Sequence, residues 1–225
     1  FTSFDYNGNY YVKVRNDVSP VFGIAEDVYD EVTKAVLKMF YYQRSGELEA
    51  EYVGELFARE AGHTQKASYY DPDDPVYGDV EIDVHGGWYD AGDFGRYITP
   101  ASKAVADLLL TAEHFPTTQE IDFGGPEKLL GEIRYELEWM LKMQNPETGG
   151  VYHKVTAKDH APMTILPHED KSPLYLSPVS AQATGDFAAV MAYAYRMYKD
   201  IDEEFANQCL DAAIFAWEWL EENPT

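Results

Sequence analysis

Hydrophobic residues recur at intervals of three or four positions in five stretches of the chain, which is the period of a helix with one buried face. The stretches are 24–44, 101–114, 127–143, 179–198 and 203–222. In the first of them, the predicted buried stripe consists of Ile24, Val28, Val32, Val36 and Phe40, with Ala35 and Met39 beside it. The pattern therefore predicts five amphipathic helices.

Residues at the start of two of these stretches favour a helix N-terminus. Pro126 precedes 127–143, where its missing N–H has no cost, and Asp202 is placed to cap 203–222. Cys209 lies on the apolar stripe of that last helix, so we predict that it packs in the core rather than acting as a reactive thiol. As the single cysteine, it also excludes an internal disulfide and an all-cysteine metal site.

Residues 10–15 follow a different pattern, because two Val and a Tyr alternate with a Tyr, a Lys and an Arg. That alternation predicts a half-buried β-strand. A single strand without a partner is not stable by itself, which leaves two interpretations open. It is either the last strand of a β domain that precedes residue 1 or an arm laid across a helical body.

Two long segments, 46–97 and 144–178, have no strong period and separate the predicted helices. Loops of this length are uncommon unless they carry function. Five helices joined by short turns and two elaborate loops favour an all-α toroid or helical bundle.

The chain carries 40 acidic and 17 basic residues, which gives a formal net charge of −23. Such a field repels nucleic acid and anionic membrane surfaces, so neither is expected as a partner. Hydrophobic residues make up 45% of the chain, enough for a core, and no apolar run approaches the ~20 residues that span a bilayer. The chain begins with Phe1 and no signal-peptide pattern follows, so we expect a processed, excised or recombinant sequence.

The segment 82–97 holds most of the candidate chemistry, with three Asp, one His, four Gly and four aromatic residues. Asp90 and Asp93 are three positions apart, so their carboxylates can converge within a tight turn. A water molecule held by one carboxylate and deprotonated by the other becomes a nucleophile. A second interpretation stays open, in which both aspartates cap a helix that begins near Pro100 and Trp88 lies in the core.

The string Gly-Gly-Trp-Tyr-Asp-Ala-Gly-Asp-Phe-Gly-Arg-Tyr at 86–97 closely resembles the signature around the catalytic aspartates of glycoside hydrolase family 9, the inverting cellulases. Three further stretches, 40–46, 143–155 and 177–189, resemble that family in the same order. The resemblance implies an (α/α)6 toroid, of which this chain is the N-terminal part. It also implies hydrolysis of β-1,4-glucosidic bonds in cellulose or cello-oligosaccharides with inversion, by a secreted, extracellular enzyme.

Carried over residue by residue, the resemblance makes Asp93 the general base and Asp90 its partner in holding the attacking water. We assign Trp88, Tyr97, His85 and His153 as candidate sugar contacts, while a structural role for the two histidines stays open. The family's general acid is a Glu near the C-terminal end of its catalytic domain, and no motif in this chain matches it. We therefore expect the fragment to be nearly inactive without the missing C-terminal part.

The resemblance also suggests a division of the chain. Residues 1–19 are assigned to the end of a preceding immunoglobulin-like β domain or to a linker arm, and 20–225 to the catalytic domain. Two alternatives to this function remain: a non-catalytic carbohydrate-binding fragment, and another (α/α)6 enzyme that cleaves polysaccharides, such as a lyase. The net charge of −23 makes the chain a poor host for the acidic polymers that lyases cleave.

Some members of the family bind a structural zinc through two Cys and two His. The corresponding positions here are Ser45, Gly62, His63 and Tyr89, so one ligand of four remains and zinc is not expected. No cofactor is required for the implied chemistry. The acidic run 71–76 invites a calcium interpretation, but Val76 stands where an EF-hand loop needs Gly. Structural calcium is compatible with the family, yet its usual ligands are not identifiable.

Overall fold

The computed structural model describes residues 4–70 and 81–224, and within them the chain is mainly helical. Its long helices are α1 (Asp30–Gln43), α3 (Ile98–His114), α4 (Leu129–Lys142), α5 (Ala181–Tyr198) and α6 (Glu203–Glu222). A short helix, α2 (Ala50–Val53), and a 3₁₀ helix, η2 (Pro116–Glu120), lie in the connections. The predicted all-α class and the five predicted helices are confirmed within the described residues.

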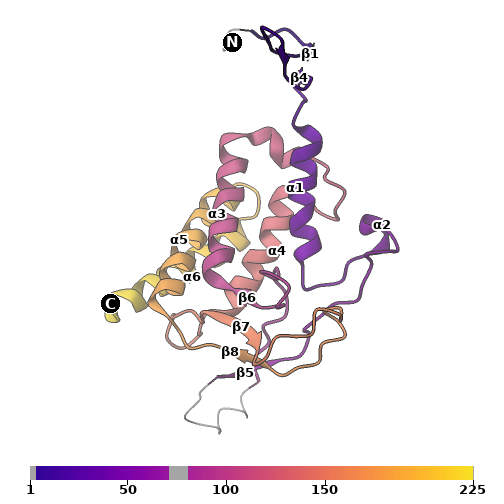
Figure 1. The fold of residues 1–225 in the computed structure, drawn as a ribbon. Coiled ribbons are helices and arrows are strands. Elements are labelled where there is room, and N and C mark those ends of the chain that lie inside the picture. Colours follow the sequence, from indigo (N-terminus) through magenta and orange to yellow (C-terminus); the bar gives the residue numbers. More distant parts are fainter. Residues whose placement is uncertain (1–3, 71–80, 225) are drawn as a thin grey trace.

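The long helices pack side by side (Figure 1). Helix α3 contacts both α4 and α5, α6 lies along α5, and α1 lies against α4. The core between them contains Val105, Leu109, Ile133, Leu137, Met140, Phe187 and Met191. Cys209 is buried in this core as predicted, and burial raises the pKa of its thiol to about 12, so it does not act as a reactive thiolate.

Side-chain caps account for the starts of the last two helices. The Asp202 carboxylate accepts the N–H of Phe205 over 3.0 Å, which confirms the predicted cap of α6. The Ser180 hydroxyl accepts the N–H of Ala183 at the start of α5 over 3.1 Å.

The first helix differs from its prediction in both its start and its buried face. It begins at Asp30, because Ile24 belongs to a strand and the following residues form turns. Its buried side chains are Leu37 and Tyr41, whereas Val32 and Val36 are 58% and 50% exposed. Since α4 is its main helical neighbour, much of the predicted apolar stripe faces solvent.

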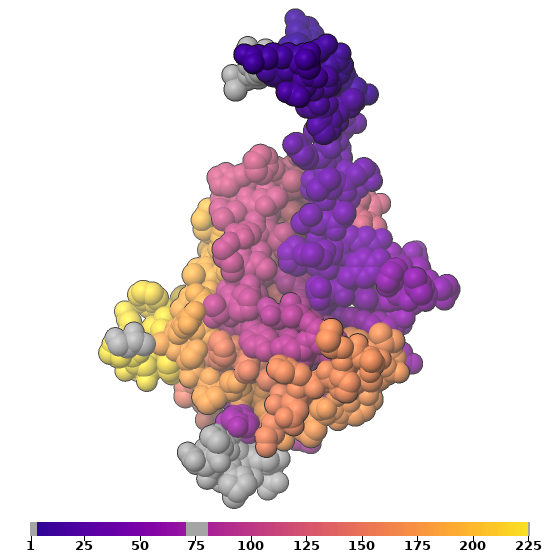
Figure 2. Space-filling model, in the orientation of Figure 1, coloured from indigo at the N-terminus to yellow at the C-terminus, as the bar shows by residue number. Residues whose placement is uncertain are grey.

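The N-terminal residues form one small hairpin nested inside a second strand pair, so the prediction of one half-buried strand is wrong. Strand β1 (Gly8–Tyr10) pairs with β4 (Phe22–Ile24), and β2 (Lys13–Val14) pairs with β3 (Asp17–Val18). No strand includes Tyr11 or Val12, so the alternating stretch is divided between β1 and β2, and the chain then turns at Arg15, whose φ is +56°. The arm stands away from the helical body rather than across it (Figures 1 and 2).

The two long segments without helical period contribute a small sheet that the pattern did not predict. Its strands are β5 (Ala67–Tyr69), β6 (Arg96–Tyr97), β7 (Lys154–Ala157) and β8 (Leu174–Leu176). They lie in the order β5-β8-β7-β6, with β5 parallel to β8 and the other pairs antiparallel. Because β6 leads directly into α3, this sheet fixes the end of the aspartate-rich segment.

Apolar side chains also face outward on α6. Trp217 is 59% exposed and Ile214 is 49% exposed. They border a shallow hollow between α5 and α6 whose remaining lining includes Ala188, Ala192 and Leu210. The helix array therefore presents apolar surface on α6 as well as on α1.

Candidate active site

The glycine pair at the start of the aspartate-rich segment lies against α4. Gly86 and Gly87 have φ values of +111° and +80°, which other residues rarely adopt. A Cβ at Gly87 would lie 2.5 Å from the indole of Trp139, a buried side chain of α4. Both the backbone conformation and this close approach therefore require glycine.

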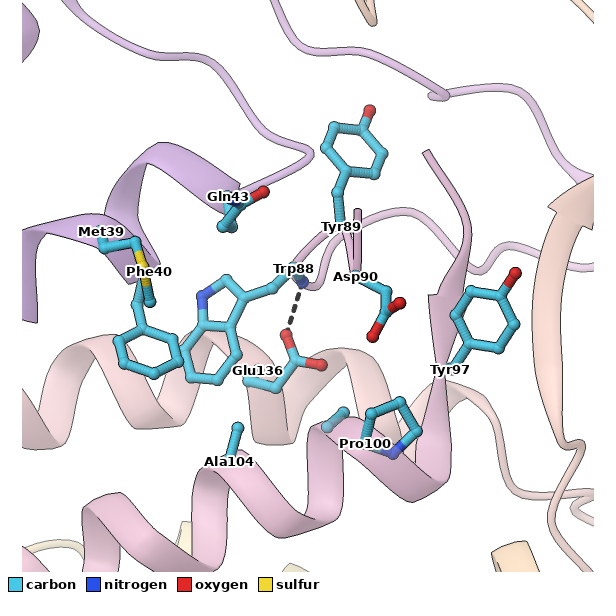
Figure 3. Close-up of a pocket in the computed structure, with 11 residues that line it drawn as sticks. Met39, Phe40, Gln43, Trp88, Tyr89, Asp90, Tyr97, Pro100, Ala104 and Glu136 are labelled. Atoms are coloured by element: carbon cyan, nitrogen blue, oxygen red, sulfur yellow. Dashed lines mark hydrogen bonds between the residues drawn. The ribbon is translucent and has the colours of Figure 1, made fainter. Parts of the chain in front are cut away.

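Two carboxyl groups of α4 hold Trp88. Its indole Nε1–H donates to Glu132 Oε1 over 2.9 Å, and its backbone N–H donates to Glu136 Oε2 over 2.6 Å (dashed line in Figure 3). The indole also packs against Phe40 of α1, with ring centroids 4.9 Å apart. Trp88 is 7% exposed, so it lies in the core. This position was expected by the interpretation in which both aspartates cap a helix.

The two glutamates differ in how their charge is balanced. Glu132 accepts hydrogen bonds from Nε and Nη2 of Arg44, at 3.0 and 2.9 Å, in a two-point ion pair. Glu136 forms no ion pair within the described residues, and its Oε1 is buried without a hydrogen bond. Burial raises the pKa of Glu136 to about 8, so this carboxyl is mostly uncharged at neutral pH.

Arg96 closes the base of the aspartate loop, by which we mean residues 84–97. Its guanidinium is fully buried, and Nη1 donates to the carbonyl oxygens of Val84 and Gly86 at 2.8 and 2.6 Å. These bonds join a residue that follows the two aspartates to residues that precede them. The loop is thereby held at both ends.

Asp90 and Asp93 lie in a turn at the tip of the aspartate loop, where the Asp90 N–H donates to the Gly95 carbonyl over 2.9 Å. Asp93 accepts the Gly95 N–H on Oδ1 at 3.2 Å and the Tyr97 hydroxyl on Oδ2 at 2.7 Å. Asp90 is exposed, and no side chain in the described part of the chain hydrogen-bonds its carboxylate. Tyr97 is the N-cap of α3 and no side chain caps that helix, so the capping interpretation of the aspartates is wrong.

Tyr97 connects this turn to strand β7. Burial, followed by the hydrogen bond to Asp93, raises the pKa of Tyr97 to about 12, so the hydroxyl keeps its proton at neutral pH. The register pairs Tyr97 with Lys154, whose Nζ lies 5.2 Å from the tyrosine ring centroid. His153 meets the same ring edge-on at 6.3 Å. The structure thus brings Tyr97 and His153 together beside Asp93.

His85 lies at the other end of the loop, away from this group. Its N–H donates to Asp83 at 3.0 Å and its carbonyl accepts Lys142 at 2.7 Å. Burial lowers the pKa of the His85 ring, whose Nε2 is buried without a partner in the described residues. His85 is not among the residues that line the pocket beside Asp90, so the geometry favours a structural role.

A pocket of about 240 Å³ opens beside Asp90, between the end of α1, the start of α3 and the aspartate loop (Figure 3). Its polar groups come from Gln43, Asp90, Tyr97 and Glu136, and its apolar wall includes Phe40 and Trp88. A second hollow of similar volume, about 240 Å³, is lined in part by Tyr70, Tyr175, Lys154 and Lys158. Aromatic faces of this kind can stack on sugar rings.

The corner formed by Ser45, Gly62, His63 and Tyr89, where some family members hold zinc, carries different side chains in this chain. His63 Nδ1 lies 2.6 Å from the Tyr89 hydroxyl, and its Nε2 lies 3.2 Å from Asp170 Oδ2. Gly62 offers no ligand, and a Cβ there would lie 2.6 Å from the Tyr89 hydroxyl. Ser45, Gly62, His63 and Tyr89 therefore do not fit a zinc ion, which needs about four N or S ligands. We propose that this hydrogen-bonded network holds the corner instead.

The calcium interpretation concerns a segment that the structure does not cover. Residues 71–76 lie outside the described residues. Within residues 4–70 and 81–224, no group of three or more His, Cys, Asp or Glu side chains is arranged to hold a metal ion. Calcium binding stays a prediction without identified ligands.

Four residues that hold the loop, Arg44, Arg96, Glu132 and Glu136, were not found by sequence reasoning. A signal existed for the two glutamates, because both fall on the helix face that carries Leu129, Ile133, Leu137 and Met140. Carboxyl groups within an apolar stripe are buried and need partners. No pattern marks Arg96, since its partners are backbone carbonyls.

Comparison with known proteins identifies the family. The model of glycosyl hydrolase family 9 matches residues 29–225. The chain belongs to glycosyl hydrolase family 9. A cellodextrinase from Butyrivibrio fibrisolvens is 39% identical over 236 residues, an alignment that covers all of this chain and 41% of that protein. Endoglucanase C from Cellulomonas fimi is 37% identical over 242 residues, which cover 96% of this chain and 22% of that protein.

Solved structures agree with this family membership. A single mutant of a thermostable endoglucanase from Alicyclobacillus acidocaldarius has a TM-score of 0.86 and 37% identity to this chain. The match covers 99% of this chain and 42% of that chain. The family 9 chain therefore spans less than half the length of these relatives. Its fold is an N-terminal part of the family's (α/α)6 barrel, as the resemblance implied.

Proposed function

We propose that the protein containing this chain hydrolyses β-1,4-glucosidic bonds in cellulose or cello-oligosaccharides, with inversion at the anomeric carbon. Asp93 acts as the general base on a water molecule, and Asp90 holds the same water. One observation carries this proposal: both carboxylates lie in one turn beside an aromatic-lined pocket, in a chain of glycosyl hydrolase family 9.

The contacts of the two carboxylates suit these roles. A carboxylate has about four lone-pair sites, and the bonds from Gly95 and Tyr97 to Asp93 use one on each oxygen. Asp93 is thus oriented and still has room for a water molecule. The exposed carboxylate of Asp90 is available to the same water. Tyr97, His153 and the wall formed by Trp88 are the proposed sugar contacts.

The general acid lies elsewhere in this proposal. Single displacement needs a second carboxyl group on the opposite side of the sugar, ~6.5–9.5 Å from the base. We place it outside residues 1–225, because the Butyrivibrio and Alicyclobacillus relatives are more than twice as long as their matched parts. Because acid–base assistance contributes ~10²–10⁴-fold, residues 1–225 alone are expected to be nearly inactive on unactivated glycosides.

The proposed substrate also bears on location. Cellulose is an insoluble polymer, so we propose that the protein acts outside the cell. None of the helices within the described residues has both the length and the apolar character needed to cross a bilayer.

Replacement of Asp93 tests the proposed function. In the complete protein, Asp93→Ala is expected to lower kcat on cellopentaose by ~10³-fold with KM changed only a few fold, because the base is lost while sugar contacts remain. Asp107→Asn is the control, since Asp107 lies on the exposed side of α3 and pairs with Lys103. An Asp93→Ala enzyme that keeps more than about a tenth of wild-type kcat would contradict the assignment.

A further inference from the structure

Glu136 of α4 contacts the aspartate loop without a part in the chemistry proposed above. It is fully buried, and its Oε2 accepts the Trp88 N–H over 2.6 Å, which is short for an N–H donor. Trp88 lies two residues before Asp90 in the chain. This bond therefore fixes the peptide from which the turn of Asp90 and Asp93 begins.

The neighbouring backbone bonds show why Glu136 matters at this point. The Gly87 carbonyl accepts the Ser45 N–H and the Tyr89 N–H donates to the Gln43 carbonyl, both over 2.8 Å. In extended backbone, successive N–H groups point to opposite sides. The Trp88 N–H thus points away from the 43–45 segment and toward α4, where Glu136 is its acceptor. Loss of that acceptor leaves a buried N–H unpaired, which disfavours this position of the peptide.

The second oxygen of Glu136 faces a different environment. Oε1 is buried with no hydrogen-bond partner in the described residues, and Glu136 forms part of the pocket wall that includes Asp90 (Figure 3). The charged or titratable groups around Glu136 come from α4, the end of α1, β6 and the aspartate loop: Glu132, Arg44, Arg96, Tyr97 and Asp90.

Neither nearby arginine forms an ion pair with Glu136 within the described residues, although the charge of Arg96 opposes the effect of burial on the pKa of Glu136. Arg44 is paired with Glu132, and Nη1 of Arg96 donates to two carbonyl oxygens. Burial raises the pKa of Glu136 to about 8, in keeping with this lack of an ion pair in the described residues. The Glu136 carboxyl is therefore mostly protonated, and so uncharged, at neutral pH.

We propose that Glu136 is a positioning residue for the turn of Asp90 and Asp93, and that its carboxyl holds the Trp88 peptide in place. The raised pKa means that it does so mostly as the uncharged acid at neutral pH. It acts through Trp88 and does not touch the reacting atoms. The kinetic consequence rests on the proposed function, whereas the consequence for the conformation of the aspartate loop does not.

Three variants of the complete protein test this role. Glu136→Met removes the acceptor at similar volume, and Glu136→Gln keeps an oxygen for the Trp88 N–H. Glu138→Gln is the control on the same helix, since Glu138 is 53% exposed and pairs with Arg134. Glu136→Met is expected to lower kcat on cellopentaose by ~10–100-fold with KM within about threefold. Glu136→Gln at about pH 6 and Glu138→Gln are expected to stay within about threefold of wild type. A kcat for Glu136→Met within about twofold of wild type overturns the proposal.

Hydrogen exchange separates this proposal from the proposed function. Peptides covering 86–97 are expected to exchange faster in Glu136→Met and at the wild-type rate in Glu136→Gln and Glu138→Gln. Equal exchange in all four proteins overturns the role of Glu136, whatever the activity. A wild-type protein that fails to cleave cello-oligosaccharides overturns the proposed function instead, and the exchange rates still decide the role of Glu136.

A pH profile decides the matter if Glu136→Met does not fold. The ratio of kcat for Glu136→Gln to kcat for wild type is expected to rise severalfold between about pH 6 and about pH 9. The reason is that the wild-type carboxyl acquires a buried charge in that range, while the amide does not. A flat ratio overturns the proposal.

Discussion

The aspartate loop and the outer faces of α1 and α6 are built in opposite ways. In the loop, buried polar groups make several hydrogen bonds within the chain: Nη1 of Arg96 donates to two carbonyl oxygens, and Trp88 donates to two carboxyl groups. On the outer faces, apolar side chains such as Val32 and Trp217 are more than half exposed. The loop that carries the aspartates is thus held by polar contacts within the described residues, whereas the outer helix faces leave apolar side chains exposed.

This difference separates the part of the chain that holds the aspartates from the helix faces that are available to contact other parts of a longer protein. The turn of Asp90 and Asp93 is held by residues close to it in the chain, by α4 and by the segment 43–45. The chain that carries these outer faces of α1 and α6 matches only 41% and 42% of the length of two relatives. We expect the rest of the longer protein to cover them, because large exposed apolar patches usually mark contact surfaces.

The largest effect on stability is expected at the ion pair that supports the loop. Arg44→Ala leaves the buried carboxylate of Glu132 without its cation, and the free energy of unfolding of the complete protein is expected to fall by ~3–5 kcal/mol. Urea unfolding measures this change.

The double replacement of Arg44 and Glu132 by Met is the matched control. It removes both charges and is expected to cost less than Arg44→Ala, since no uncompensated charge remains in the core. A double variant that is less stable than Arg44→Ala would show that the pair itself, rather than an unpaired charge, dominates.

The second effect concerns pH. Glu136 has an ordinary pKa of 4.5 that is raised to about 8 in the folded protein. Between these values the unfolded state releases the proton and the folded state keeps it, so stability falls as pH rises through this window. Glu136→Gln lacks that proton, and its Tm is expected to fall by several degrees less than the wild-type Tm between about pH 5 and about pH 8. Parallel Tm curves would contradict the buried neutral carboxyl.

A smaller effect is expected at the glycine that touches α4. Gly87→Ala is expected to destabilise the complete protein by ~1–3 kcal/mol, because φ is +80° and the new methyl meets Trp139. Gly92→Ala is the control, since a methyl group added there would meet no atom within 4 Å beyond its chain neighbours. Thermal unfolding of the two variants compares them, and equal losses would contradict the close packing at Gly87.

The smallest effect is expected on the outer face of α1. In residues 1–225 alone, Val32→Gln is expected to change the free energy of unfolding by less than ~0.5 kcal/mol, because Val32 is 58% exposed. In the longer protein, the same change is expected to cost more than ~1 kcal/mol if the face is covered. Equally small effects in both proteins would show that this face stays in contact with water.

The helices were predictable because their hydrophobic period is strong, although the start signal at Pro126 was two residues early, since α4 begins at Leu129 with Lys128 as its N-cap. Asp202 caps α6 as predicted, and Cys209 lies in the core. The buried side of α1 was not predictable, since periodicity shows that a helix has an apolar stripe but not which neighbours cover it. The single strand predicted at 10–15 was wrong, because an alternating pattern does not show that one strand ends at Tyr10 and another begins at Lys13.

The candidate site was predictable in its residues and only partly in its geometry. Asp90, Asp93 and Tyr97 are close in sequence, so a turn brings them together. The contact of Tyr97 with His153 depends on the pairing of β6 with β7, between segments more than fifty residues apart. Glu136 falls on the apolar face of its helix, which indicates burial, but its partner is a backbone N–H that residue types do not reveal.

The most direct test of the central claim is the anomeric form of the first product. Proton NMR of cellopentaose during hydrolysis by the complete protein resolves the α- and β-anomers before mutarotation mixes them. The proposed action of Asp93 on water predicts that the α-anomer forms first, because water attacks from the side opposite the leaving group. Initial formation of the β-anomer would contradict the account.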